Sequence, residues 1–240
     1  MQYHTDVKGL DSVIGCQDSD SLILVKKGLL TPLNEQRRHR DSLYDVRELK
    51  NVVTQITEAD STNEMYSLSS YEHLFSLFNA SWQDILLAVF TFKLEVVLTG
   101  EYRDTILSRC YVSRFRILRF LVKHLRSQAK SDIQISKESV SSILAISAGE
   151  LKQLAKAGIL TPIEYNNYGR AYHLKECTDF LKSYWSLRRW ATIHGLCEDR
   201  LVQFLEEHHI KSTYSRFIYS KSYKLKYALR NYHQDNSSEK

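Results

Sequence analysis

Polar and basic side chains in the segment 147–156 have the types and spacing needed to read DNA. They are Ser147, Glu150, Lys152, Gln153 and Lys156. Glutamine pairs with adenine through two hydrogen bonds, and lysine contacts guanine or phosphate. Leu151, Leu154 and Ala155 recur at helical spacing, so they should face a core and leave Glu150 and the other polar residues outward. An ordinary solvated helix face is the alternative interpretation.

Two loops carry further candidate contacts. We expect Asn166, Asn167 and Arg170 to lie on a β wing that follows this helix. Near the start of the chain, a compact basic cluster could contact the DNA backbone; it comprises Arg37, Arg38, His39 and Arg40. Asp18 and Asp20 precede that cluster and would repel phosphate. We therefore expect the early region either to contact the backbone through its wing only or to serve in packing, and a solvated loop is the alternative.

Two longer segments are strongly basic. Residues 103–130 hold eight Lys or Arg and one acid, and residues 211–230 hold six Lys or Arg and no acid. The candidates for phosphate contact in them are Arg114, Arg116, Arg119, Lys221, Lys224 and Lys226. In the first segment, Phe115, Leu118, Val122 and Leu125 are predicted to form the apolar stripe of a helix. The second interleaves Tyr214, Tyr219, Tyr223 and Tyr227, which suit base stacking or core packing, and we favour the core.

Catalytic and metal-binding patterns are weak. The S-x-x-K sequence at 127–130 falls in a polar stretch without the supporting motifs of a serine nucleophile. The run "EEHH" at 206–209 places adjacent residues on different faces of a helix and has no ligand set at zinc spacing. The sequence contains no P-loop, dinucleotide-binding glycine set or H-E-x-x-H motif. We therefore expect no enzymatic activity and no cofactor.

The composition favours a helical protein inside the cell. The 240 residues include only eight glycines and two prolines, and their formal net charge is +5. Few turn formers favour helices, and a mild positive charge is compatible with a nucleic-acid partner. The four cysteines form no C-x-x-C pair, the first residues lack the apolar core of a secretory leader, and the most apolar stretch is interrupted by Lys93 and Glu95. We expect a cytoplasmic protein with free thiols and no membrane association.

An internal repeat defines the elements that position these side chains. "KKGLLTPL" at 26–33 returns as "KAGILTPI" at 156–163, and each copy contains one of the two prolines. Gly28 and Gly158 are predicted to end a helix in a left-handed conformation, after which the proline prevents the helix from resuming. Tyr44 and Tyr172 occupy equivalent places before a further helix. This order of helix, turn, helix, loop, small strand and helix is typical of a winged helix-turn-helix.

The repeat predicts a mainly α fold with small β wings, built from tandem winged helix-turn-helix modules. We expect a first module at 1–57, a linker at 58–72, a third module at 127–184, a degenerate fourth module at 185–232 and a frayed tail at 233–240. Residues 73–126 are expected to form a divergent second module that lacks the helix-turn-helix pair.

The motif "L…L.KAGILTP…GRAY.L.E" resembles the winged-helix module of MerR-type regulators and phage excisionases. The tandem arrangement without a catalytic core resembles the C-terminal part of TniQ-type transposition proteins, although the cysteine-rich zinc ribbon of that family has no counterpart here. The resemblance implies a target-selection factor that binds DNA or a guide complex.

Two functional hypotheses follow. The first is a non-catalytic protein that binds double-stranded DNA and acts in transposition or recombination as a target-selection or architectural factor. Several weak modules in series would then gain affinity through effective concentration. The alternatives are an adaptor that docks on other transposition proteins or a guide-RNA complex, and a transcriptional regulator of the MerR or excisionase type. The acidic start of the early region favours the adaptor.

Overall fold

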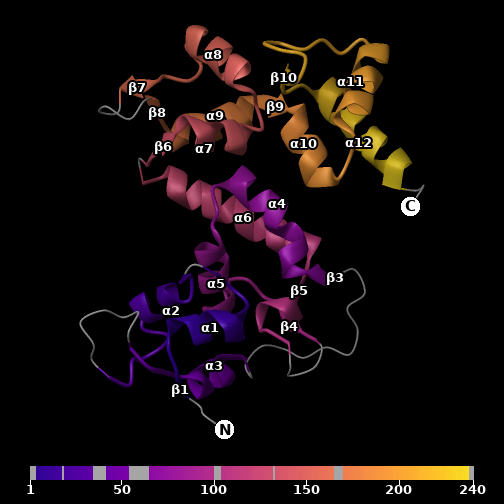
Figure 1. Ribbon diagram of the computed structural model, residues 1–240. Coiled ribbons are helices and arrows are strands. Elements are labelled where there is room, and N and C mark those ends of the chain that lie inside the picture. Colours follow the sequence, from indigo (N-terminus) through magenta and orange to yellow (C-terminus); the bar gives the residue numbers. More distant parts are fainter. Residues whose placement is uncertain are drawn as a thin grey trace. The chain divides into compact units, whose positions relative to one another are not determined.

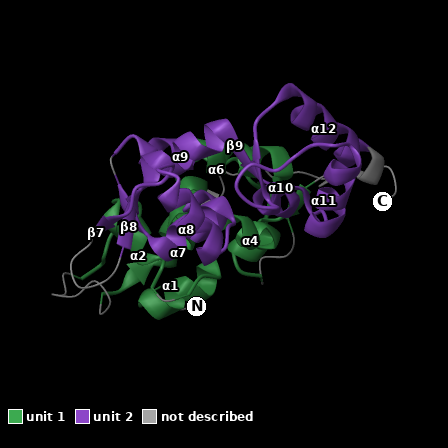
Figure 2. Cartoon of the chain, turned by 90° about the horizontal axis from the view of Figure 1, so that it is seen from above, with its two compact units in different colours: residues 1–75, 80–123 green, residues 76–79, 124–240 purple. Residues whose placement is uncertain are grey.

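A computed structural model of the chain describes residues 4–17, 19–34, 42–53, 65–99, 104–131, 133–164 and 170–237. These residues are mainly helical, as expected from the composition, and their short strands pair in small antiparallel sheets, as expected from the repeat (Figure 1). The chain divides into two compact units, residues 1–75 with 80–123 and residues 76–79 with 124–240 (Figure 2). In the described residues, no helix combines the length and apolar character needed to cross a bilayer.

The first unit contains short helices and strands. They are β1 (His4–Thr5), α1 (Val7–Ile14), α2 (Leu22–Lys26), β2 (Tyr44–Asp45), α3 (Val46–Val53), β3 (Met65–Ser67), the 3-10 helix η2 (Leu68–Tyr71), α4 (Glu72–Phe75), α5 (Trp82–Phe90), β4 (Val97–Leu98), the 3-10 helix η4 (Leu107–Arg109), β5 (Cys110–Ser113) and the part of α6 (Arg114–Ala129) up to Lys123. Its sheets are β1–β2 and β3–β5–β4.

The second unit contains the 3-10 helix η3 (Ser76–Phe78), the end of α6 and the whole C-terminal half. The further elements are β6 (Gln134–Ser136), α7 (Lys137–Leu144), α8 (Ala148–Lys156), β7 (Ile163–Glu164), β8 (Arg170–His173), α9 (Leu174–Ser183), β9 (Tyr184–Ser186), α10 (Leu187–His194), α11 (Glu198–Glu207), β10 (Ile218–Ser220) and α12 (Tyr223–Ser237). Its sheets are β6–β8–β7 and β9–β10.

One order of elements recurs along the chain: a strand, two helices joined by a turn, a strand and a final helix. We call the four occurrences the first (4–53), second (65–129), third (134–183) and fourth (184–237) repeats. In each, the opening strand pairs antiparallel with the strand directly before the final helix, as β1 with β2, β3 with β5, β6 with β8 and β9 with β10. Figure 1 shows this succession in the change of colour along the chain.

Two residues with positive φ mark equivalent turns in every repeat. The first position, after the first helix, is occupied by Gly15, Asn79, Ala145 and Gly195. The second position, after the second helix, is occupied by Gly28, Phe92, Gly158 and His209, thirteen residues later in the first three repeats and fourteen in the fourth. The residue after each donates its N–H to the carbonyl five positions before itself, as Ile159 does to Leu154 at 3.0 Å. This bond is that of a Schellman helix end.

These turns correct the expectation for the second repeat. Its two helices, α4 and α5, are joined by a turn at Asn79, although the sequence pattern indicates no such pair. Strand β3 and helix η2 occupy 65–71, within the predicted linker, and residues 58–64 lie outside the described residues. Helix α12 continues to Ser237, so residues 233–237 are helical and the prediction of a frayed tail is wrong for them.

The glycine and Thr-Pro motif has the same function in both copies. Gly28 and Gly158 each have φ of +69°, which confirms the predicted left-handed helix ends. The Thr31 N–H donates to Glu48 at 2.9 Å, and the Thr161 N–H donates to Glu176 at the same distance. Both carboxylates belong to the third residue of the final helix. In the second repeat, which lacks Thr-Pro, that position is Arg116.

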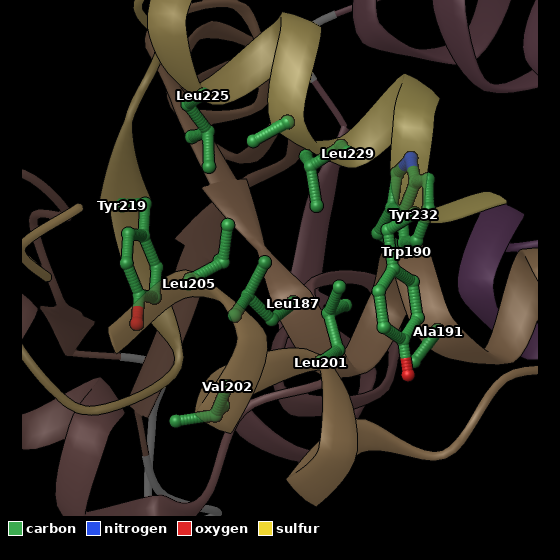
Figure 3. Close-up of a cluster of buried hydrophobic side chains, with 11 residues drawn as sticks. Leu187, Trp190, Ala191, Leu201, Val202, Leu205, Tyr219, Leu225, Leu229 and Tyr232 are labelled. Carbon is green, nitrogen blue, oxygen red and sulfur yellow. The ribbon is translucent and has the colours of Figure 1, made fainter. Parts of the chain in front are cut away.

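The final helix of the fourth repeat closes a small core. In the fourth repeat, side chains from α10, α11, β10 and α12 converge on one another (Figure 3). They are Leu187, Trp190, Ala191, Leu201, Val202, Leu205, Tyr219, Leu225, Ala228, Leu229 and Tyr232. Tyr44 and Tyr172, each two residues before the final helix, are buried at equivalent places in the first and third repeats. Burial of these apolar side chains is the main force that holds each repeat together.

The buried stripe of α6 differs from the predicted one. Ile117, Leu121 and Leu125 are buried at i, i+4 and i+8, whereas Phe115 is 73% exposed. Of the four residues predicted to face the core, Leu125 alone is fully buried, and Leu118 and Val122 are half-buried at its borders. The helix is therefore rotated relative to our expectation. Both stripes have helical spacing, and only the packing against neighbouring elements selects one of them.

Candidate nucleic-acid interface

The start of α8 is held by a capping box. Ser147 accepts the Glu150 N–H on its Oγ at 3.2 Å, and the Glu150 carboxylate accepts the Ser147 N–H at 2.8 Å. This reciprocal arrangement satisfies two N–H groups that a helix start leaves without intrahelical partners. Glu150 is buried, at 7% exposure, so the prediction that it faces outward and reads bases is wrong. The hydroxyl of Ser147 is likewise engaged within the chain.

Glu150 also joins the third repeat to the fourth. Arg188 Nη1 lies 2.5 Å from Glu150 Oε2, and Ser215 Oγ donates to Oε1 of the same carboxylate. Burial raises the pKa of Glu150, but hydrogen bonds from Ser215, the Ser147 N–H and Arg188 outweigh it, and the pKa is lowered overall. The carboxylate is therefore an ionised acceptor at neutral pH and positions the start of α8 against the fourth repeat.

The opposite side of α8 is open and basic. Lys152, Gln153 and Lys156 are exposed, while Leu151 and Leu154 are buried as predicted. Gly149 lies one turn earlier on the same side, and a Cβ there would meet only Ser147 Oγ, at 3.8 Å. We call Gly149, Lys152, Gln153 and Lys156 the α8 face. It carries two cations, one amide and no acid, and its glycine allows close approach of a ligand to the helix.

The segment predicted to form the wing of the third repeat is described in part. Strands β7 and β8 are antiparallel, with Glu164 opposite Arg170, and Arg170 is exposed at the start of β8. Asn166 and Asn167 lie outside the described residues, as do Arg37, Arg38 and Arg40 of the early basic cluster. Their predicted roles therefore stay predictions.

Two described carboxylates beside α2 in the first repeat make internal contacts, and Asp18 lies outside the described residues. Asp11 is buried and accepts the N–H groups of Ser19 and Ser21, at 3.0 and 3.1 Å. Asp20 accepts a hydrogen bond from Gln83 of α5. Helix α2 has five residues and follows directly on this network. These contacts favour the packing role over base reading for this repeat.

Helix α6 presents the three predicted arginines outward. Arg114, Arg116 and Arg119 are exposed, and Arg116 lies 3.5 Å from Glu95. An exposed ion pair of this kind contributes little to stability, so it leaves the guanidinium able to exchange partners. The arginines therefore remain candidates for phosphate contact.

Helix α12 divides its side chains between a core and an exposed face. Tyr219 of β10 is buried, as expected, but Tyr223 and Tyr227 are 86% and 60% exposed, so the core interpretation is wrong for these two. Lys224 and Lys226 are exposed beside them. Lys221 differs, because its Nζ donates to the Leu181 carbonyl at 2.6 Å and its pKa is lowered by burial. Its ammonium group is therefore engaged within the chain, although the side chain is exposed.

Two arginines at the junction of the third and fourth repeats escape prediction from the sequence. Arg188 stacks on the Phe217 ring at 3.6 Å, and the buried Arg189 donates to the carbonyls of Leu77 and Ile143. Burial lowers the pKa of Arg189 to about 10. Both residues contact backbone or side-chain groups that are remote in the sequence, and helical periodicity does not indicate such contacts.

None of the protein-family models, curated protein sequences or solved structures compared with the chain matches it.

Proposed function

We propose that the chain is a non-catalytic DNA-binding protein of tandem winged helix-turn-helix modules, with the α8 face as its principal contact with double-stranded DNA. The single observation that supports this most is the α8 face itself. Two lysines and a glutamine occupy its successive turns, on the second helix of a helix pair, which is the helix that enters the major groove in this class. Arg170 on the wing would add a phosphate contact.

Other basic surfaces are further candidates for phosphate contact. Arg114, Arg116 and Arg119 on α6, together with Lys224 and Lys226 on α12, would neutralise further phosphates. By its resemblance to TniQ-type proteins and excisionases, we assign the protein to transposition or recombination, as a target-selection or architectural factor. Gln153 is the residue on the α8 face that can discriminate bases, since it can pair with adenine.

A salt titration of binding to a labelled random-sequence duplex tests the proposal. The affinity should fall steeply as salt rises, because each phosphate contact releases counterions. The variant K152Q/K156Q should bind more weakly and reduce the slope of log K against log salt by about 2. The matched control K175Q/K182Q removes two exposed lysines from α9 and should leave the slope unchanged. Absence of duplex binding at low salt would overturn the proposal.

A second candidate function is a protein-interaction adaptor, and one observation favours it for the fourth repeat. Its second helix, α11, exposes Asp199, Glu206 and Glu207 at the position equivalent to the α8 face. Arg216 pairs with the first two, and Glu207, which has no ion pair among the described residues, would repel phosphate. An adaptor docking on other transposition proteins or a guide-RNA complex would show no affinity for duplex DNA at low salt. The K152Q/K156Q substitutions would not change the affinity of such an adaptor for its partner.

A further inference from the structure

Helix α12 combines exposed aromatic rings with cations. Tyr223 and Tyr227 are separated by one helical turn and share a face, to which Lys226 and Arg230 also belong. Lys224 borders it. All five side chains are exposed, whereas Leu225 and Leu229 on the other side are buried in the core of the fourth repeat. We call these five residues the α12 face.

The cations of the α12 face are available to a ligand. The ion pairs found in the described part of the fourth repeat use Arg188 and Arg216, and they leave Lys224, Lys226 and Arg230 without a carboxylate partner. The sequence contains no Asp or Glu from 208 to 234. The stretch 208–234 around the face therefore carries cations and no acid, with Asp235 as the next acid along α12, and a polyanion is its complement.

The tyrosines indicate what kind of polyanion fits. Four residues of helix separate the two rings by about 6 Å along the axis. A base that stacks on a ring at each of its faces requires a separation between the two rings of about twice the 3.4 Å base spacing of a strand. One base therefore fits between Tyr223 and Tyr227 after a small side-chain adjustment. Both rings are exposed enough for such an adjustment.

We propose that the α12 face binds single-stranded nucleic acid, with Tyr223 and Tyr227 stacking on unpaired bases and with Lys224, Lys226 and Arg230 contacting the phosphates. This combination of cations and stacking aromatics is the general basis of single-strand binding. A duplex would use only the cations, because its bases already stack on one another. The inference goes beyond the proposed duplex binding. Lys224 and Lys226 would contact phosphates in either case, but the two tyrosines would stack only on unpaired bases, whereas the base-reading residue of the duplex proposal lies on α8.

Fluorescence anisotropy with labelled oligothymidylate, oligouridylate and a random duplex tests this inference on the full chain. We expect the chain to bind at least one of the two single-stranded probes. The variant Y223A/Y227A should weaken that binding about tenfold or more, because each stacked base contributes substantially to affinity. The variant Y223F/Y227F retains the rings and should bind nearly as the wild type does.

The controls separate stacking from charge and from folding. Tyr66, 59% exposed on β3, provides a matched substitution, and Y66A should leave the affinity unchanged. Circular dichroism of Y223A/Y227A should match the wild type, because both rings lie outside the core. Preference for one oligonucleotide indicates DNA or RNA as the ligand if oligodeoxyuridylate, which lacks the thymine methyl group, binds as oligothymidylate does. Equal binding by Y223A/Y227A and wild type, or no single-strand binding at low salt, overturns the inference.

The two proposals can fail separately. K152Q/K156Q should weaken duplex binding and leave single-strand binding to the α12 face within about twofold. Y223A/Y227A should weaken single-strand binding and leave duplex binding within about twofold. If oligonucleotide binding were lost in K152Q/K156Q and retained in Y223A/Y227A, the single strand would occupy the α8 face and the α12 inference would be wrong.

Discussion

The Glu150 carboxylate, which caps α8 of the third repeat, accepts a hydrogen bond from Arg188 of α10 in the fourth repeat. Their Nη1–Oε2 distance is 2.5 Å, and the two side chains are 8% and 27% exposed. Arg188 also lies 3.6 Å from Glu198 and stacks on Phe217. The start of α8, the helix proposed to contact DNA, is therefore held in place by side chains of the neighbouring repeat.

Breaking this pair should destabilise the chain. We expect R188Q to lower the free energy of unfolding by about 2 kcal/mol, because a mostly buried carboxylate loses its counter-charge. E150Q should cost less, since glutamine also completes a capping box. The double variant R188Q/E150Q should lose less free energy of unfolding than the two single variants lose together. A double-mutant cycle measured by urea denaturation should give a coupling energy of about 1 kcal/mol or more.

Arg216 provides the control for that cycle. It lies 3.4 Å from Asp199, but both side chains are more than half exposed. R216Q should therefore change the free energy of unfolding by no more than about 1 kcal/mol. Equal losses in R188Q and R216Q would contradict the assignment of Glu150 and Arg188 as a buried junction.

The same carboxylate predicts a pH dependence of stability. Because the pKa of Glu150 is lower in the folded chain than in the unfolded chain, its contribution is complete above the unfolded value of about 4.3. That contribution is lost as the pH falls through the folded pKa. Urea denaturation at a series of pH values should therefore show a wild-type advantage over E150Q that is largest near neutrality and disappears in acid. An advantage that grew on acidification would contradict the lowered pKa.

Much of the third repeat is predictable from local sequence, because local rules decide its elements. Gly158 terminates α8, and Leu151 and Leu154 form the buried stripe. The position of Glu150 is not predictable in this way, since its partners Arg188 and Ser215 are remote in the sequence. The second repeat escapes detection for another reason. Asn79 and Phe92 occupy turn positions where glycine is the recognisable signal.

Two alanine substitutions, one at a helix end and one inside the helix, test the turn assignment. Gly158 has φ of +69°, and a Cβ added to it would have no neighbouring atom within 4 Å, so G158A should cost about 1 kcal/mol through backbone strain alone. Gly149 lies inside α8 in open surroundings, and G149A should stabilise by up to about 1 kcal/mol. Thermal denaturation should shift in opposite directions for the two variants, and a shift in the same direction would refute the assignment.

His209 gives the reverse test in the fourth repeat. It is exposed, has φ of +54° and occupies the position that glycine occupies in the first and third repeats. The next residue, Ile210, completes the helix end by donating to Leu205 at 2.9 Å. H209G should remove the left-handed strain and raise the free energy of unfolding by about 0.5 kcal/mol, the balance between that relief and the greater chain entropy of glycine. His208, one position earlier, has an ordinary negative φ of −88°, so H208G should instead lower the free energy of unfolding. If H208G stabilised the chain and H209G did not, the assignment of the turn to His209 would be wrong.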